Sequence, residues 1–191
     1  TSYPRGLAAL IDDEPVRYAV IDAGTNSIKF HIGEHDTGGK WHTVVDRAEL
    51  TRLGEGLAQQ GVIGDAALQR TAVAIAAMAD EAKHHGVRAI AAVGTAGLRI
   101  AANGNEVVDA IRARTGVHIE VISGEEESRL AYVAAKAGLG LNQGSLVVFD
   151  TGGGSSQFTF GHDAVVDERF SVDVGAVRFT ERFGLDRAVS P

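Results

Sequence analysis

Two short stretches of the chain each combine a carboxylate, glycine and hydroxyl side chains directly after an apolar run. The first is Asp22-Ala23-Gly24-Thr25-Asn26-Ser27, and the second is Asp150-Thr151-Gly152-Gly153-Gly154-Ser155-Ser156. Because glycine has no Cβ, backbone N–H groups in such a turn can approach a ligand closely and form a concavity that binds anions. A carboxylate at the end of the preceding strand suits a metal-bound water or a hydroxyl donor. Each stretch is therefore typical of a phosphate-binding loop with an aspartate, Asp22 or Asp150, placed for a divalent cation.

The alternative for either stretch is a tight β-hairpin without a ligand. Strands are expected at residues 16–21 and 28–33 around the first loop, and at residues 145–149 and 158–160 around the second. The order of strand, Asp-x-Gly, hydroxyl and strand therefore occurs twice. Two such hairpins from separate parts of one chain can hold a polyphosphate from two sides, so the repetition favours phosphate binding over two unrelated turns.

A cation and a carboxylate elsewhere in the chain are candidates for the same site. Arg99 follows the expected strand 87–93 and lies about one turn into a short helix, with Thr95 as its expected N-cap. A cation beside a helix N-terminus is a good anion site, although Arg99 pairing with a nearby carboxylate fits the local sequence equally well.

Glu127 lies in the first turn of a helix expected to begin at Ser123 and run to Lys136. Ser123 and Glu126 have the spacing of a capping box, and acidic side chains in a first turn favour the helix dipole. The residues expected on the same helical side as Glu127 are apolar: Leu130, Ala131 and Ala134. We therefore expect Glu127 to face the interior, where a carboxylate can orient an attacking water and accept its proton.

Two further polar features have weaker support. Arg52 lies between the glycines of the loop 50–57, where a phosphate contact and an ordinary surface arginine are equally compatible with the sequence. His84 and His85 end a long helix, and adjacent helical residues point to different faces, which argues against a shared metal ion.

The elements that must position these residues alternate between strands and helices. In the first half of the chain, apolar periodicity and glycine breaks predict a strand at 41–48, a helix at 66–85 capped by Asp65, and a helix at 106–114. They then predict a strand at 117–122 and a connector at 139–144. A strand pair is expected over 164–174 around Asp167-Glu168, followed by a helix at 176–183 opened by Gly175.

Composition excludes several kinds of protein. The chain has 191 residues, of which 45% are hydrophobic, enough for one large domain or two small ones. Its net charge of −7 argues against nucleic acid or an anionic membrane as the main partner. It has no cysteine, which excludes disulfides, thiolate zinc sites and a cysteine nucleophile. There is no apolar run of membrane-spanning length and no leader-like N-terminus, so we expect a cytoplasmic protein.

The chain also contains five motifs in a fixed order: Asp22-Ala23-Gly24-Thr25-Asn26-Ser27, Gly94-Thr95-Ala96-Gly97-Leu98-Arg99, Ile122-Ser123-Gly124-Glu125-Glu126-Glu127-Ser128-Arg129, Asp150-Thr151-Gly152-Gly153-Gly154-Ser155-Ser156 and Val174-Gly175-Ala176-Val177-Arg178. Together, over roughly residues 17–185, they resemble the exopolyphosphatase/guanosine pentaphosphate phosphatase family. The resemblance implies an α/β, ribonuclease-H-like fold of the acetate and sugar kinase/actin superfamily, in which mixed sheets flanked by helices border a cleft. It implies a first domain at 1–128, a helix and linker at 129–144, and the start of a second, truncated domain at 145–191.

The resemblance further implies hydrolysis of a phosphoanhydride bond in inorganic polyphosphate or guanosine pentaphosphate, with Mg²⁺ or Mn²⁺. The implied phosphate-binding residues are Gly24, Thr25, Asn26, Ser27, Arg99, Gly152, Gly153, Gly154 and Ser155. Glu127 matches the proposed catalytic base, and Asp22 and Asp150 match carboxylates near metal and water. We expect no nucleic-acid or membrane partner, and the oligomeric state stays open, with a homodimer among the options.

One residue departs from the family pattern. The family often has a glutamate at the position of Gln157, and an amide cannot act as a base. Two alternatives to the hydrolase therefore stay open: a non-catalytic phosphate or nucleotide sensor, and a kinase of the same superfamily. The kinase needs an adenosine-binding segment, and the sequence shows no such stretch.

Overall fold

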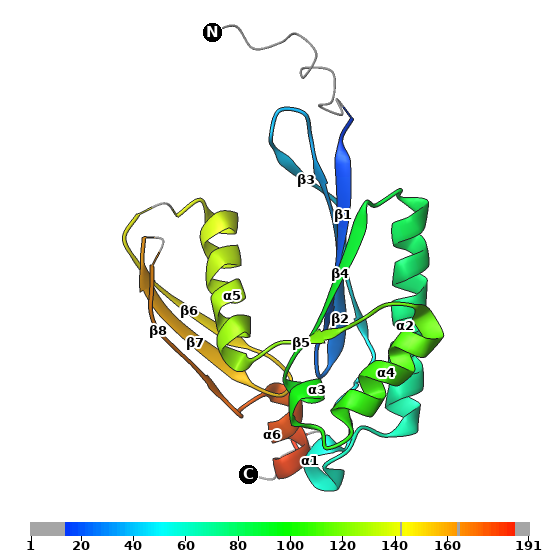
Figure 1. Ribbon diagram of the computed structural model, residues 1–191. Coiled ribbons are helices and arrows are strands. Elements are labelled where there is room, and N and C mark those ends of the chain that lie inside the picture. The colour runs from blue at the N-terminus through cyan, green and yellow to red at the C-terminus, as the bar shows by residue number, and fades with distance from the viewer. Residues whose placement is uncertain (1–13, 142, 164, 186–191) are drawn as a thin grey trace, which may run out of the picture.

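The computed structural model describes residues 14–141, 143–163 and 165–185, which form two sheets and their helices (Figure 1). The first sheet has five strands in the order β3-β2-β1-β4-β5. Its strands are β1 (Val16–Ala23), β2 (Ser27–His35), β3 (Trp41–Leu50), β4 (Ala89–Gly94) and β5 (Glu120–Val121). The β1-β2 and β2-β3 pairs are antiparallel, whereas the β1-β4 and β4-β5 pairs are parallel. This mixed sheet confirms the predicted α/β, ribonuclease-H-like fold.

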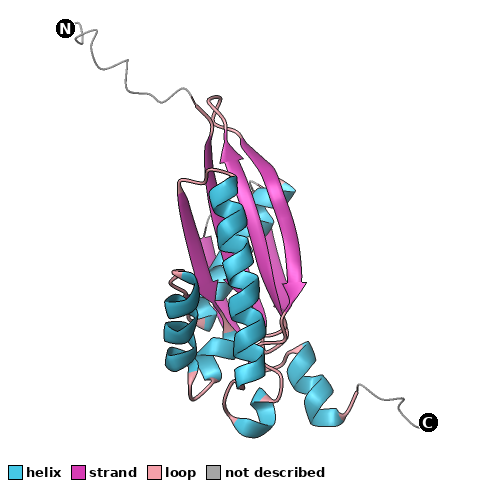
Figure 2. Cartoon of the chain, turned by 90° about the vertical axis from the view of Figure 1, so that its right-hand side faces the viewer, coloured by secondary structure: helices cyan, strands magenta, loops and turns pink. Residues whose placement is uncertain are grey.

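The core of this first part lies between the sheet and its long helices. Alternate residues of β2 (Ile28, Phe30 and Ile32) are fully buried, because one face of the strand packs against the helices. The helices are α1 (Leu57–Gln60), α2 (Asp65–His84), α3 (Ala96–Ile100) and α4 (Gly104–Thr115). Helices α2 and α4 lie to the right of the sheet in Figure 1, and Figure 2, seen from that side, shows helices in front of the strands.

The second sheet repeats the antiparallel part of the first on a smaller scale. Its order is β6-β7-β8, built from β6 (Ser145–Thr151), β7 (Ser156–His162) and β8 (Val165–Val172), and it is accompanied by α5 (Gly124–Leu139) and α6 (Ala176–Phe183). Helix α5 packs on one face, where Thr159 donates a hydrogen bond to the Ser128 carbonyl over 3.1 Å. The other face carries a row of phenylalanines that includes Phe149, which is 60% exposed and whose ring centroid lies 4.6 Å from that of Phe158.

The structure corrects two of the expected strand assignments. The strand expected at 117–122 is only two residues long, because the Val117 amide bonds the Thr115 hydroxyl and pairing with β4 begins at Glu120. The strand pair expected around Asp167-Glu168 is a single strand, β8, because the chain turns earlier, after His162. The remaining corrections concern helix starts and faces.

Two predicted helix caps differ in detail from the prediction. Asp65 is the first residue of α2 rather than its cap, because Gly64 holds the extended N-cap conformation. Thr95 does occupy the N-cap of α3, but its side chain makes no capping hydrogen bond. By contrast, the predicted cap of α5 is confirmed: the Ser123 hydroxyl accepts a hydrogen bond from the Glu126 amide over 3.1 Å.

The buried face of α5 also differs from the predicted one. Leu130 is 40% exposed and Ala134 is exposed, whereas Ser128 and Tyr132 are buried against the second sheet. The α5 helix therefore packs through a face one position away from the expected apolar side. The domain limits inferred from the sequence stay a prediction, with their outer ends outside the described residues. None of the helices in the described ranges is both long and apolar enough to cross a membrane.

Candidate active site

The two glycine loops meet where the two sheets approach each other. Each loop is closed by the same kind of bond: Gly24 donates to the Ser27 carbonyl over 3.1 Å, and Gly152 donates to the Ser155 carbonyl over 2.9 Å. A Cβ placed on Gly153 would lie 3.1 Å from the Asn26 Cβ. The structure thus brings the two sequence-predicted loops face to face.

Thr25 lies at the centre of this meeting point. Glycines at 54, 97 and 154 surround its side chain so closely that a Cβ on Gly154 would lie 2.7 Å, and one on Gly97 3.1 Å, from the Thr25 hydroxyl oxygen. That hydroxyl is buried and has no hydrogen-bond partner among the described residues. A buried hydroxyl without a partner is unfavourable, which is consistent with a ligand that supplies one.

Arg99 and Glu127 form an ion pair beside the loops. Both guanidinium Nη atoms of Arg99 donate to Glu127 Oε2 over 3.2 Å, and Nη1 also donates to the Ile122 carbonyl over 2.8 Å. The side chains are 24% and 18% exposed. The structure therefore shows the carboxylate pairing of Arg99 that the sequence left as an alternative, and it places Glu127 inward as predicted.

Three carboxylates share this region and influence one another. Burial raises the pKa of Glu127, Arg99 opposes that rise, and the charges of Asp22 and Asp150 add to it. Burial likewise raises the pKa of Asp22, which Lys29, 3.7 Å away, opposes and Asp150 reinforces. Like charges gathered in a half-buried site cost free energy unless a cation joins them.

Asp22 and Asp150 fit a hard divalent cation in one respect. The Oδ1 atom of Asp22 is buried without a hydrogen-bond partner, so a cation can satisfy it. The described residues contain no group of three or more His, Cys, Asp or Glu side chains that could bind a metal ion. Mg²⁺ is commonly bound by one or two carboxylates together with substrate phosphates.

Gln157 is built into the second loop. It is 1% exposed, pairs across the sheet with Asp150, and donates from Nε2 to the Ser155 hydroxyl over 2.6 Å. Its amide oxygen is buried and has no partner among the described residues. Sequence reasoning identified Gln157 by its difference from the family pattern, but the contact to Ser155 depends on the side-chain conformation and was not predicted.

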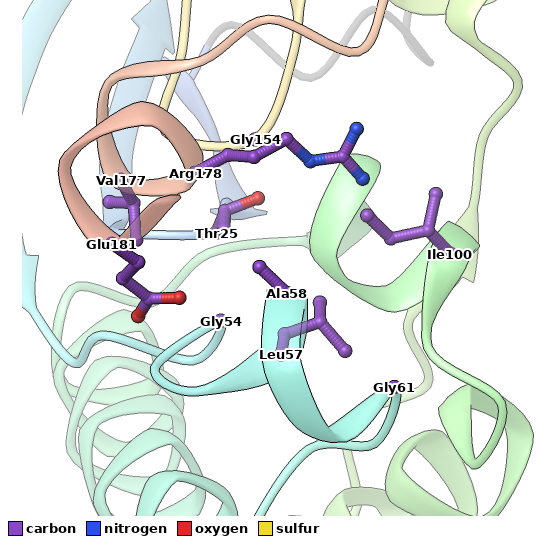
Figure 3. Close-up of a pocket in the computed structure, with 10 residues that line it drawn as sticks. All are labelled: Thr25, Gly54, Leu57, Ala58, Gly61, Ile100, Gly154, Val177, Arg178 and Glu181. Atoms are coloured by element: carbon purple, nitrogen blue, oxygen red, sulfur yellow. The ribbon is translucent and has the colours of Figure 1, made fainter. Parts of the chain in front are cut away.

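A cavity of about 220 Å³ opens beside the loops. Figure 3 shows Thr25 and Gly154 of the loops, Leu57 of α1, and Arg178 and Glu181 of α6 around it. Sequence reasoning missed Glu181, because its importance arises from a bond across 125 residues of sequence: its Oε1 accepts from the Gly56 amide over 2.9 Å.

The weaker candidates stay predictions or have simpler explanations. The Arg52 side chain is exposed, and its backbone amide donates to the Asn26 carbonyl of the first loop over 2.8 Å, so a phosphate contact by its side chain stays a prediction. His84 is exposed and its Nδ1 lies 2.7 Å from the Asp80 carbonyl of the same helix, an ordinary helix-end contact.

The fold and the paired loops define a two-lobed α/β protein whose glycine loops meet between its two sheets. The model of the Ppx/GppA phosphatase family matches residues 31–191. Exopolyphosphatase 2 of Mycobacterium tuberculosis is 35% identical over 175 residues, which cover 87% of this chain and 54% of that protein. The guanosine-5'-triphosphate,3'-diphosphate pyrophosphatase of Aliivibrio fischeri is 32% identical over 176 residues, which cover 92% of this chain and 35% of that protein.

A solved structure agrees with these relatives. The Ppx/GppA family member of Aquifex aeolicus superposes with a TM-score of 0.77 at 30% identity, over 89% of this chain and 55% of that one. The chain therefore belongs to the Ppx/GppA phosphatase family. It spans about half the length of Exopolyphosphatase 2, the first of these curated relatives.

Proposed function

We propose that this protein is a phosphoanhydride hydrolase that releases the terminal phosphate of inorganic polyphosphate, the 5′ γ-phosphate of guanosine pentaphosphate, or both. The observation that carries the proposal is the pair of facing glycine loops with the Arg99–Glu127 pair beside them. Family membership supports the same reaction, because the two named relatives are an exopolyphosphatase and a guanosine-5'-triphosphate,3'-diphosphate pyrophosphatase.

The mechanism consists mainly of positioning and charge neutralisation. The loop residues Gly24 to Ser27 and Gly152 to Ser155 bind phosphate oxygens through backbone N–H groups and hydroxyls. Arg99 neutralises charge that develops on the transferred phosphoryl group. A Mg²⁺ or Mn²⁺ ion held by Asp22 and Asp150 would supply further neutralisation of the phosphate oxygens when bound.

Glu127 acts as the general base in this proposal. Its pKa is raised by burial, which brings a carboxylate closer to the working pH and makes it a better proton acceptor. Arg99 opposes this rise and pairs with the Glu127 carboxylate in the free protein. When substrate phosphate binds, it competes for the Arg99 guanidinium and leaves Glu127 available to orient the attacking water.

A phosphate sensor without turnover is the second candidate, and Gln157 is the observation that favours it. A neutral amide beside Asp150 lowers the negative charge available to hold a cation. Binding of substrate by the loops does not depend on that charge, so a sensor would retain the phosphate loops while losing hydrolysis.

The test is phosphate release from long-chain polyphosphate and from guanosine pentaphosphate with Mg²⁺, for the parent chain, Glu127→Gln and Glu125→Gln. Loss of a general base lowers turnover by roughly 10²–10⁴-fold, so Glu127→Gln should be nearly inactive. Glu125 is the matched control, because its side chain is 73% exposed in the same helical turn. Equal release by the parent and Glu127→Gln would remove Glu127 from its role, and binding without release by the parent would favour the sensor.

A further inference from the structure

Backbone N–H groups of α6 hold the second glycine loop from behind. The Ala176 amide donates to the Gly152 carbonyl over 2.9 Å, and the Val177 and Arg178 amides donate to the Gly153 carbonyl over 2.9 and 3.1 Å. These are the amides of the first helical turn, which have no partner inside a helix. The loop carbonyls therefore take the place of a helix cap.

The first glycine loop is held in the same way by a different segment. The Gly54 amide donates to the Thr25 carbonyl over 2.8 Å, and the Arg52 amide donates to the Asn26 carbonyl over 2.8 Å. Arg52 adopts a positive φ of 49° here, which is uncommon for a residue other than glycine. Two unrelated segments thus make the same contact with two equivalent loops.

These contacts fix the direction of the loop amides. In a trans peptide group, the C=O and the following N–H point in opposite directions. Holding the Gly152 and Gly153 carbonyls against α6 therefore turns the N–H groups of Gly153 and Gly154 away from the helix. Neither of these two amides makes a hydrogen bond within the described part of the chain, so both are available to an anion.

The close approach requires glycine in both backing segments. A Cβ on Gly175 would lie 2.5 Å from the Gly154 nitrogen and would also overlap the Gly153 carbonyl. A Cβ on Gly54 would overlap the Thr25 methyl group. Gly175 has a φ of −144°, which any residue adopts, so the requirement there is for space and not for a special backbone conformation.

We propose that α6 and the segment 52–54 are positioning elements that direct the loop amides at bound phosphate, with Gly175 and Gly54 as the residues that permit it. None of the residues of α6 is buried, so its contribution to the core is small. The Ser156 hydroxyl strengthens the arrangement by donating to the Val174 carbonyl over 2.6 Å. The inference rests on the proposed function because the ligand is the same phosphate.

The test compares Gly175→Ala with Gly64→Ala. Gly64 is the matched control: it is also an extended N-cap glycine without a side-chain cap, and a Cβ there meets nothing within 4 Å. The ¹H–¹⁵N spectrum of the free protein reports the amides of Gly153 and Gly154, and titration with inorganic tripolyphosphate and Mg²⁺ reports affinity. Thermal unfolding shows whether Gly175→Ala still folds. If it does not fold, Ser156→Ala is a milder second variant.

We expect Gly175→Ala to move the Gly153 and Gly154 resonances in the free protein and to weaken tripolyphosphate binding by about tenfold or more, the effect of losing one or two charge-assisted hydrogen bonds. Gly64→Ala should leave both unchanged, and Ser156→Ala should give a smaller effect of the same kind. Unmoved loop resonances, or unchanged affinity in the Gly175 and Ser156 variants, would overturn the inference. Lack of tripolyphosphate binding by the parent would instead count against the proposed function, and the free-protein spectra would still decide whether α6 directs the loop.

Discussion

At the scale of single residues, the pKa of Glu127 reflects opposing influences. Burial and the neighbouring carboxylates raise it, and Arg99 lowers it. A general base works only when ionised, so turnover should fall as the pH drops through this raised pKa, at a pH above the ordinary glutamate value of 4.5. We therefore expect the Arg99–Glu127 pair to set the acid limit of the proposed activity.

Arg99→Gln tests this balance directly. Removing the guanidinium removes the influence that lowers the pKa of Glu127, so the acid limb of turnover should move to higher pH. The measurement is kcat/KM against pH, because kcat/KM reports the pKa of Glu127 in the free protein, where Arg99 pairs with it. A loss of phosphate affinity lowers kcat/KM at every pH and does not shift the acid limb. Arg129→Gln is the control, because Arg129 pairs with Glu126 and not with Glu127. An acid limb that stays in place or moves to lower pH would contradict the assignment.

Gln157→Glu places a carboxyl group in a buried position next to Asp150. Burial and the neighbouring charge should raise the pKa of the new carboxyl, so its ionised form should cost on the order of 2 kcal/mol of stability at neutral pH. Because the folded-state pKa is raised, this cost is present above that pKa and is relieved as the pH falls through it.

Mg²⁺ should reverse the effect of Gln157→Glu if the site binds a cation. Thermal unfolding with and without Mg²⁺ measures this, and we expect a larger Mg²⁺-dependent rise in Tm for the variant than for the parent. Gln59→Glu is the control, since Gln59 is exposed on α1. An equal response to Mg²⁺ in all three proteins would argue against a metal site at Asp150.

At the scale of elements, helix α5 positions Glu127 through its first turn. The Ser123 hydroxyl caps this turn by accepting from the Glu126 amide. Ser123→Ala should lower the free energy of unfolding by about 1 kcal/mol, the usual value of a lost N-cap. Turnover should fall as well, because fraying of the first turn displaces Glu127.

Urea unfolding and phosphate release together check the Ser123 prediction. Ser145→Ala is the control, because Ser145 is exposed at the start of β6. A variant that loses stability but keeps full turnover would show that Glu127 is held by Arg99 alone and not by the helix cap.

Some features of the helices and strands could be predicted from the sequence and others could not. Short-range signals predicted both glycine loops, the α5 cap and the helix opened by Gly175, because each depends on neighbouring residues. The prediction of the buried face of α5 was wrong, because the second sheet packs against Ser128 and Tyr132 rather than against the more apolar side that includes Leu130. The length of β5, which has two residues, was overestimated because buried Val117 and Ile119 have the alternating apolar pattern of a strand.

The candidate site likewise has features that the sequence predicts and features that it does not. Its charged residues and loops could be predicted because they lie in recognisable motifs. The contacts that hold them could not be predicted, because they join segments far apart in the chain. The bond from Gly54 to Thr25 and those from the start of α6 to the second loop are backbone contacts with no side-chain signature.

At the scale of the whole molecule, two sheets of related topology place one glycine loop each at a common meeting point. The relative orientation of the sheets therefore decides whether the loops can hold one phosphate together. Glu181 is a polar link between them: it belongs to α6, which follows the second sheet, and accepts from Gly56, which precedes α1 of the first part. Its second oxygen is buried without a partner among the described residues. The cost of burying this oxygen offsets part of the stability that the bond to Gly56 contributes.

Glu181→Ala should therefore change the relative orientation of the two sheets more than the stability of the protein. It removes the bond to Gly56 together with the unpartnered oxygen, so Tm should change little while the two sheets gain freedom to move relative to each other. Spin labels on Ala77→Cys and Ala134→Cys measure this, because both alanines are exposed, on α2 and α5, and the chain has no cysteine of its own. We expect the label-to-label distance distribution to broaden in Glu181→Ala and to stay narrow in the control Arg182→Ala, whose side chain lies over Phe183 of the same helix. An unchanged distribution would mean that the direct contacts between the loops, such as Gly153 against Asn26, suffice to fix the two sheets.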